Sequence, residues 1–180
     1  MTGETELLHA LADKQAITEI IHLYCRGIDR TDRALLLSLF HPDSTHKHGA
    51  FSGRSVDFID RALGTVSGLR TTSHLIGNIV IELDGDTALT EAYYFVHHRV
   101  PGSSGQPQDD EDYLAQGRYI DRFERREGNW RIAHRTGVWD WRRWEKASDR
   151  GFYDMPASQR GARWPDDEIY ARKRPAAPKD

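Results

Sequence analysis

The strongest constraint on the fold is a run of four long segments in which apolar and polar residues alternate, the pattern of a half-buried β-strand. The turn Asp84-Gly85-Asp86 joins the first two segments, and four residues, 125–128, join the last two. Strands joined by such short turns run antiparallel. The sequence therefore predicts a long antiparallel meander, with strands over Thr71–Leu83, Thr87–Val100, Asp112–Glu124 and Asn129–Trp141.

Helical patterns precede these strands. Apolar residues recur at steps of three and four, which predicts one helix, or two joined near Asp13, with an inward-facing stripe of Leu7, Leu8, Leu11, Ile17, Ile20, Ile21, Tyr24 and Ile28. Asp32 has the chemistry of an N-cap for a short helix over Arg33–Phe40. A short strand and turn over Thr45–Gly53 and a helix ending near Gly68 follow. Helices followed by an antiparallel meander predict an α+β fold.

Length and composition support one domain, residues 1–141, followed by an extension over residues 142–180. The 180 residues suffice for one sizeable core. The extension contains four prolines and scattered aromatic residues without steady periodicity. We expect it to pack over a pocket mouth or a neighbouring subunit, with an extended surface tail as the alternative.

Several classes of protein are disfavoured. The 25 basic and 28 acidic residues are interspersed and give a net charge of −3, so no basic stripe indicates nucleic-acid binding. No apolar run approaches the length of a membrane span, and the first residues do not resemble a signal peptide. The single cysteine, Cys25, cannot form an internal disulfide and is interpreted as a packing residue. These features predict a cytoplasmic protein.

Three residues stand out as candidates for chemistry. His74 lies in a predicted strand between small hydroxyl residues and a series of isoleucines and valines. A histidine there is either a base or a core residue that bonds a backbone carbonyl. Asp29 ends the predicted first helix, and Tyr24 precedes it by five residues, about 140° around an ideal helix. Those two share a pocket only if the helix bends or ends near Gly27.

The pattern resembles the nuclear-transport-factor-2-like, or SnoaL-like, superfamily over roughly Leu7–Trp141. Its enzyme branch includes scytalone dehydratase, bile-acid 7α-dehydratase and hexachlorocyclohexane dehydrochlorinase. The matching segments are Tyr-Cys-Arg-Gly-Ile-Asp with Tyr24 and Asp29, Ser-His-Leu-Ile-Gly-Asn with His74, and Asn-Trp-Arg-Ile-Ala-His-Arg with Arg135. The resemblance implies a cone-shaped, curved antiparallel sheet that encloses a pocket with the N-terminal helices.

The resemblance also implies a cofactor-independent lyase. His74, oriented by Asp29, would remove a proton, while Tyr24 and Arg135 would assist a departing group. That group is water, or formaldehyde from a lignin-derived aromatic dimer, and isomerisation is an alternative. Arg135 faces the cone only if a bulge intervenes, and otherwise His134 takes its place. We expect an aromatic or polycyclic small-molecule substrate, with pocket walls formed by Phe51, Phe58, Tyr94, His98, Tyr119 and Trp139.

Two rival readings concern metal binding and a non-catalytic role. A metal site could form from four histidines: His46, His48, His97 and His98. No fixed zinc signature is present, and we expect no metal or other cofactor. His97 and His98 point to opposite faces of a strand. A non-catalytic small-molecule binder, or a module like the β subunit of ring-hydroxylating dioxygenases, is the other reading.

Assembly is predicted from the strand over Thr87–Val100, which is apolar on both faces. One face carries Tyr93, Phe95 and His97, and the other carries Ala92, Tyr94 and Val96. A sheet with two apolar faces needs a second cover, and another subunit is the simplest one. We predict a homo-oligomer, with a trimer favoured over a dimer.

Overall fold

The long helix α1 (Thr2–Asp29) and the short helix α2 (Arg33–Ser38) open the chain in the computed structural model, which describes residues 2–148 and 154–172. Strands β1 (Phe40–His48) and β2 (Phe51–Arg54) form a hairpin, and α3 (Ser55–Ser67) follows. The Asp32 carboxylate accepts a hydrogen bond from the Leu35 amide at 2.9 Å, the predicted N-cap of α2. The expected α+β order is confirmed.

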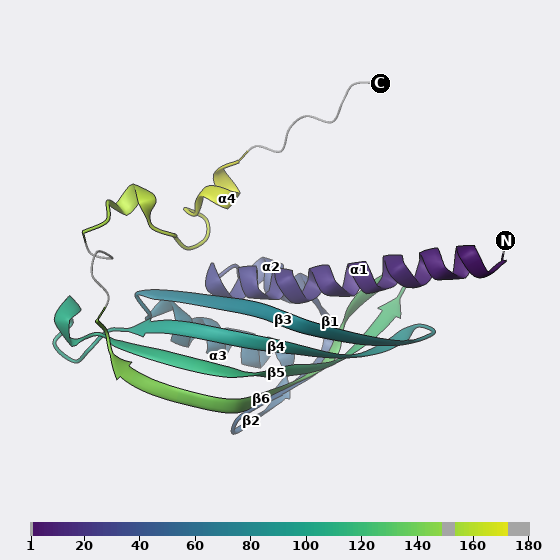
Figure 1. Ribbon diagram of the computed structural model, residues 1–180, viewed down its shortest axis with the longest axis horizontal. Helices are drawn as coiled ribbons and strands as arrows, with labels where there is room; N and C mark the ends of the chain where they lie inside the picture. The colour runs from purple at the N-terminus through teal and green to yellow at the C-terminus, as the bar shows by residue number, and fades with distance from the viewer. Residues whose placement is uncertain (1, 149–153, 173–180) are drawn as a thin grey trace.

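Four long strands complete the domain: β3 (Thr71–Asp84), β4 (Thr87–Val100), β5 (Glu111–Arg126) and β6 (Asn129–Lys146). They form the predicted antiparallel meander within a six-stranded sheet of order β2-β1-β6-β5-β4-β3. Strand β1 joins the last strand, β6, in parallel, which the sequence did not predict. The helix α3 carries the chain from β2 at one edge of the sheet to β3 at the other edge, and the meander then returns to β1 (Figure 1).

Three one-residue irregularities bend the meander. Asn78 is skipped in the pairing of β3 with β4 and has a positive φ of 48°. Ala133 and Asp140 are skipped in the pairing of β5 with β6. An extra residue on one strand increases the local bend and twist. The sheet consequently curves, as Figure 1 shows, and its concave side faces the helices.

The core lies between the concave face of the sheet and the helices. Ala88, Ala92 and Ala115 on this face are at most 3% exposed. Ile17 and Ile21 of α1 are fully buried, as the stripe predicted. The prediction was wrong at the start of the helix, where Leu7, Leu8 and Leu11 are 55–59% exposed. The physical reason is length, since this end of α1 extends past the sheet (Figure 1).

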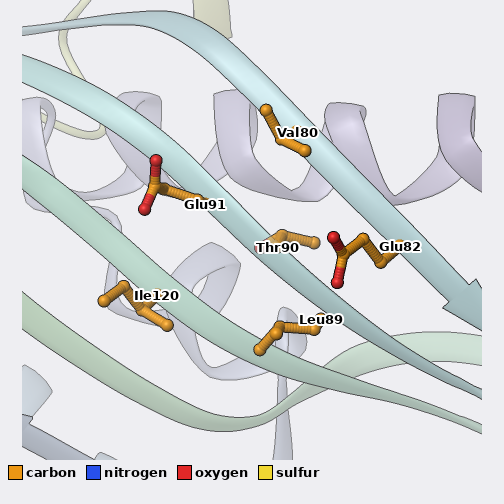
Figure 2. A pocket seen from close by; sticks show the side chains of 6 residues that line it. All are labelled: Val80, Glu82, Leu89, Thr90, Glu91 and Ile120. Atoms are coloured by element: carbon orange, nitrogen blue, oxygen red, sulfur yellow. The ribbon is translucent and has the colours of Figure 1, made fainter.

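The convex face of the sheet also carries apolar side chains. Exposed examples are Leu75, Val80, Leu89, Phe95 and Trp141. Figure 2 shows a hollow on three neighbouring strands, where Val80, Leu89 and Ile120 lie beside the carboxylates of Glu82 and Glu91. The hollow measures about 260 Å³.

Three short elements complete the described part: a 3-10 turn at Pro107–Asp109, a second at Ala157–Gln159, and helix α4 (Glu168–Ala171). Within the described residues, no helix has both the length and the apolar character needed to cross a membrane.

Candidate active site

Asp29 and His74 meet where the end of α1 contacts the start of β3. The Nδ1 atom of His74 lies 2.7 Å from Oδ1 of Asp29, so the predicted contact is present. The backbone N–H of His74 donates to Oδ2 of the same carboxylate at 2.8 Å. Burial alone would raise the pKa of Asp29, but the hydrogen bonds and charge of His74 outweigh it and hold that pKa below its usual value. Asp29 is therefore an ionised acceptor that fixes the ring of His74.

A hydroxyl links the pair to a second histidine. The Thr72 hydroxyl donates to Oδ1 of Asp29 at 3.2 Å and lies 2.8 Å from Nδ1 of His98. Because an ionised carboxylate can only accept, the single hydroxyl proton goes to Asp29, and Nδ1 of His98 must donate to Thr72. Burial, with a smaller contribution from His74, lowers the pKa of His98 to about 4. His98 is therefore neutral at pH 7, with its lone pair on Nε2.

A cavity of about 260 Å³ lies beside the two histidines. Of the predicted wall residues, Phe58, His98, Tyr119 and Trp139 line it. Phe51 packs behind Phe58 with ring centroids 5.4 Å apart. The remaining lining residues come from α1, α3, β1 and β3: Tyr24, Ile28, His48, Arg61, Ala62, Thr65, Val66 and His74.

Tyr94 is also set back from the cavity. Its ring stacks on that of Tyr119 at 4.5 Å, and its hydroxyl donates to the carbonyl of Val138 at 3.1 Å. Phe51 and Tyr94 therefore support wall residues and do not form the wall themselves.

Tyr24 reaches the cavity wall, and Arg135 does not. The fully buried guanidinium of Arg135 pairs with Asp121 through contacts of 2.7 and 2.6 Å. It stacks on the rings of Tyr24 and Tyr119 at 4.0 and 4.3 Å. Burial raises the pKa of Tyr24 to about 12 despite this neighbouring cation. Tyr24 therefore stays a neutral phenol that can donate a proton or a hydrogen bond.

The bulge at Ala133 decides which basic residue of β6 turns inward. Without it, Arg135 would lie on the face opposite Trp130 and Ile132. The extra residue shifts the alternation, so Arg135 joins Trp130 and Ile132 on the buried face. His134 instead contacts the Thr45 hydroxyl at 2.7 Å, on the partly exposed side. Arg135 thus lies on the buried face and His134 on the other, and neither of them lines the cavity.

The rival histidine cluster is not assembled. Nε2 of His97 lies 2.6 Å from Asp112 on the other face of β4 from His98. His46 stacks on Phe58 with ring centroids 3.6 Å apart. Within residues 2–148 and 154–172, no group of three or more histidine, cysteine, aspartate or glutamate side chains is arranged to hold a metal ion.

The C-terminal segment touches the end of α1. Arg163 donates to the backbone carbonyl of Asp29 and, at 3.3 Å, to that of Val66 on α3. The N–H of Trp164 donates to the carbonyl of Arg30 at 2.7 Å. The role of the extension over a pocket mouth stays a prediction, and its residues 149–153 and 173–180 lie outside the described part.

Sequence reasoning missed Thr72, Arg61 and Thr65. Thr72 could have been found, because it lies two residues before His74 and so on the same face of the strand. Arg61 and Thr65 are exposed on α3, one helical turn apart, and line the cavity. Their polar character gave no reason to assign them to a pocket, because exposed polar residues are typical of any helix surface.

Comparison with known protein families and solved structures identifies the same architecture in other proteins. The model of the SnoaL-like domain matches residues 9–136. The fold is similar to that of hexachlorocyclohexane dehydrochlorinase LinA type 2, with 18% sequence identity and a TM-score of 0.69. The match covers 79% of this chain and 95% of that chain. A candidate scytalone dehydratase from Novosphingobium aromaticivorans matches at 22% identity, 78% of this chain, 91% of that chain and a TM-score of 0.64.

The Kfla4162 protein from Kribbella flavida matches at 19% identity, 74% of this chain, 95% of that chain and a TM-score of 0.65. No functionally curated protein matches significantly. Identities this low establish a shared fold, while the domain model covers well over half of the 180 residues. The chain therefore belongs to the family of SnoaL-like domains, with the NTF2-like cone fold.

Proposed function

We propose that this chain is a cofactor-independent lyase acting on an aromatic small molecule. One observation carries the proposal: Nδ1 of His74 is held by Asp29, while the same ring lines a cavity. The Nε2 atom is then the nitrogen left to take a proton from a bound molecule. The carboxylate of Asp29 would stabilise the imidazolium that forms.

The leaving group would depart with help from Tyr24. In this scheme His74 removes a proton from carbon, the bond from the neighbouring carbon to oxygen breaks, and the phenol of Tyr24 donates a proton to the departing oxygen. Transfer of the proton from His74 to Tyr24 restores both groups, so the net products are an alkene and water. In a diaryl propane diol the same base would take the proton of the hydroxymethyl group. The bond to the hydroxymethyl carbon breaks to release formaldehyde, its electron pair forms the alkene, and the neighbouring hydroxyl leaves as water with the proton from Tyr24.

Arg135 enters this scheme as a positioning residue. Its guanidinium is fully buried and paired with Asp121, and it supports the rings of Tyr24 and Tyr119 from behind. A direct contact between Arg135 and the leaving group is not part of the proposal.

The size of the cavity narrows the substrate. Sites for drug-sized ligands measure roughly 300–1,000 Å³, and this cavity measures about 260 Å³. Phe58, Tyr119 and Trp139 supply flat apolar walls. A substrate of one or two aromatic rings fits these dimensions better than a larger polycycle.

A non-catalytic small-molecule binder is the second candidate. The observation that favours it is the pairing of Arg135 with Asp121, which removes from the cavity the cation expected to stabilise a leaving anion. Binding by a cavity with aromatic walls needs no such charge.

A panel of aryl alcohols and diaryl propane diols, followed by absorbance, separates the two candidates. Turnover by the wild type is expected to fall to background in His74→Ala and by about 10²–10⁴-fold in Asp29→Asn. Tyr24→Phe should be milder, because it deletes one donor and keeps the ring. Ser73→Ala, on the exposed side of β3, is the matched control.

One outcome would contradict the lyase activity, and another would contradict the role of His74 in it. Binding without turnover of any member of the panel supports the non-catalytic candidate. Turnover that persists in His74→Ala overturns the assigned base. Addition of EDTA should leave the rate unchanged.

We also propose a homo-oligomer, with a trimer favoured, built on the convex face of the sheet. Leu75, Val80, Leu89 and Phe95 are 39–68% exposed there and form a broad apolar surface. Apolar surfaces of this kind are typical of subunit contacts.

A further inference from the structure

His48 is seated in the cavity wall with one edge of its ring against the backbone of β6. A Cβ atom on Gly137 would lie 2.2 Å from Nδ1, 2.6 Å from Cε1 and 2.9 Å from Cγ of His48. Only glycine admits the ring at this distance. Trp139 packs edge-on against His48 at 4.9 Å, and Phe58 is nearly parallel to it at 5.5 Å. The ring is therefore fixed, and its Nε2 edge faces away from Gly137.

The packing of the His48 ring determines which of its nitrogens carries the proton. The Nδ1 atom of His48 is buried and has no hydrogen-bond partner among the described residues. Burial, followed by the charges of Arg135 and His74, lowers the pKa of His48 to about 4, so the ring is neutral and holds one proton at pH 7. A proton on Nδ1 would be a buried donor without an acceptor, and such groups are rare in proteins. The proton therefore belongs on Nε2.

This arrangement is the reverse of that in the other two histidines. His74 directs Nδ1 toward Asp29 at the end of α1, and His98 directs Nδ1 toward Thr72 on β3, so both leave the Nε2 lone pair as an acceptor. They come from β3 and β4, whereas His48 comes from β1 near the other edge of the curved sheet. Among the three histidines of the cavity, the two acceptors thus lie on one side and the donor lies on the other.

We propose that His48 is a specificity-determining residue whose Nε2–H donates to an acceptor oxygen of the ligand, such as a ketone oxygen. This inference rests on the cavity being the substrate site, as in the proposed function. Together with the acceptors across the cavity, it selects aromatic compounds that carry a carbonyl or ether oxygen at one end and an acidic C–H or O–H at the other.

The first test needs no ligand. The full chain, labelled with ¹⁵N, is studied at pH 7 by long-range ¹H–¹⁵N correlation, which distinguishes the two neutral forms of each histidine. The His48 signals are identified by their loss in His48→Phe. We expect the proton on Nε2 in His48 and on Nδ1 in His98. A proton on Nδ1 of His48, or an averaged mixture of the two forms, overturns the proposal.

The second test measures binding of acetophenone against ethylbenzene, a pair matched in size that differ in the carbonyl oxygen. The preference for acetophenone should fall by about threefold to tenfold in His48→Phe. His48→Gln, which retains an N–H donor, should recover most of it. His134→Phe, a change on the other face of β6, is the control and should leave the preference unchanged.

The outcomes separate this inference from the proposed function, because neither test depends on turnover. An unchanged preference in a folded His48→Phe variant overturns the donor role even if His74 proves to be the base. If neither compound binds, the position of the proton on His48 still shows whether its Nε2 can act as a donor. A preference that depends on His48 supports the proposal even if no substrate is turned over.

Discussion

Replacing His46 by leucine should make the protein more resistant to acid. His46 is 1% exposed, and neither ring nitrogen has a hydrogen-bond partner among the described residues. Burial, with smaller contributions from Arg135 and His48, lowers the pKa of His46 to about 2. The unfolded chain takes up this proton near pH 6.5, while the folded chain does not. The contribution to stability is therefore complete above pH 6.5 and is lost as the pH falls toward 2.

The size of the effect follows from these two pKa values. Between pH 7 and pH 5 the unfolded state gains about 2 kcal/mol from protonation of His46. His46→Leu removes this protonation. Between pH 7 and pH 5, the free energy of unfolding of the variant should therefore fall by about 2 kcal/mol less than that of the wild type. Leucine also removes two unsatisfied buried nitrogens, which should stabilise the fold by about 1–3 kcal/mol. The loss of stacking on Phe58 should destabilise it by about 1 kcal/mol. We expect the variant to be at least as stable as the wild type at pH 7.

Urea unfolding at pH 7 and pH 5 measures the stability of each protein at pH 7 and its loss of stability between the two pH values. His22→Leu, at an exposed position on α1, is the matched control for loss of a histidine as such. Equal losses of stability in the wild type and His46→Leu would refute the reasoning. A variant much less stable than the wild type at pH 7 would show instead that the nitrogens have partners.

Two further changes test the buried ion pair and the assembly. Asp121→Asn leaves the guanidinium of Arg135 buried without its counter-charge and should cost about 3–5 kcal/mol in urea unfolding. A loss below about 1 kcal/mol would show that the pair is not needed. Leu75→Glu combined with Leu89→Glu places charges on the convex face and should convert the proposed oligomer to monomers in light scattering. A wild type that is monomeric at micromolar concentration would contradict the assembly.

The sequence predicted the meander closely because alternation of apolar and polar residues is a local signal. The predicted strand Thr87–Val100 has the observed bounds, and its neighbours extend a few residues further. The parallel pairing of β1 with β6 could not be predicted in this way, since it joins residues as far apart in the chain as Thr45 and His134, 89 positions. The exposed start of α1 was missed for a similar reason. The pattern of Leu7, Leu8 and Leu11 identifies a helix face and does not show where the sheet ends.

The Asp29–His74 contact was predicted only through the family pattern, because 45 residues separate the two. Helix α1 continues past Gly27 to Asp29, and Tyr24 lines the cavity while Asp29 contacts His74 beside it. Gly27 admits Leu36 of α2 at this point, where a Cβ atom would lie 2.8 Å from the leucine side chain. The tautomers proposed for His48 and His98 could not be predicted, since they depend on Gly137 and Thr72, which are distant from them in the chain.

The single extra residue at Ala133 has a consequence for how sequences of this kind are aligned. Deleting Ala133 would remove the bulge, restore plain alternation and leave every later residue of β6 on the side of the sheet that it now occupies. Arg135 would then still lie opposite Asp121 on the neighbouring strand, although it would stand one position earlier in the chain. A basic residue one position earlier or later in a relative can thus occupy the same place in space. Alignments of β6 should accordingly match the side of the strand and not the residue count.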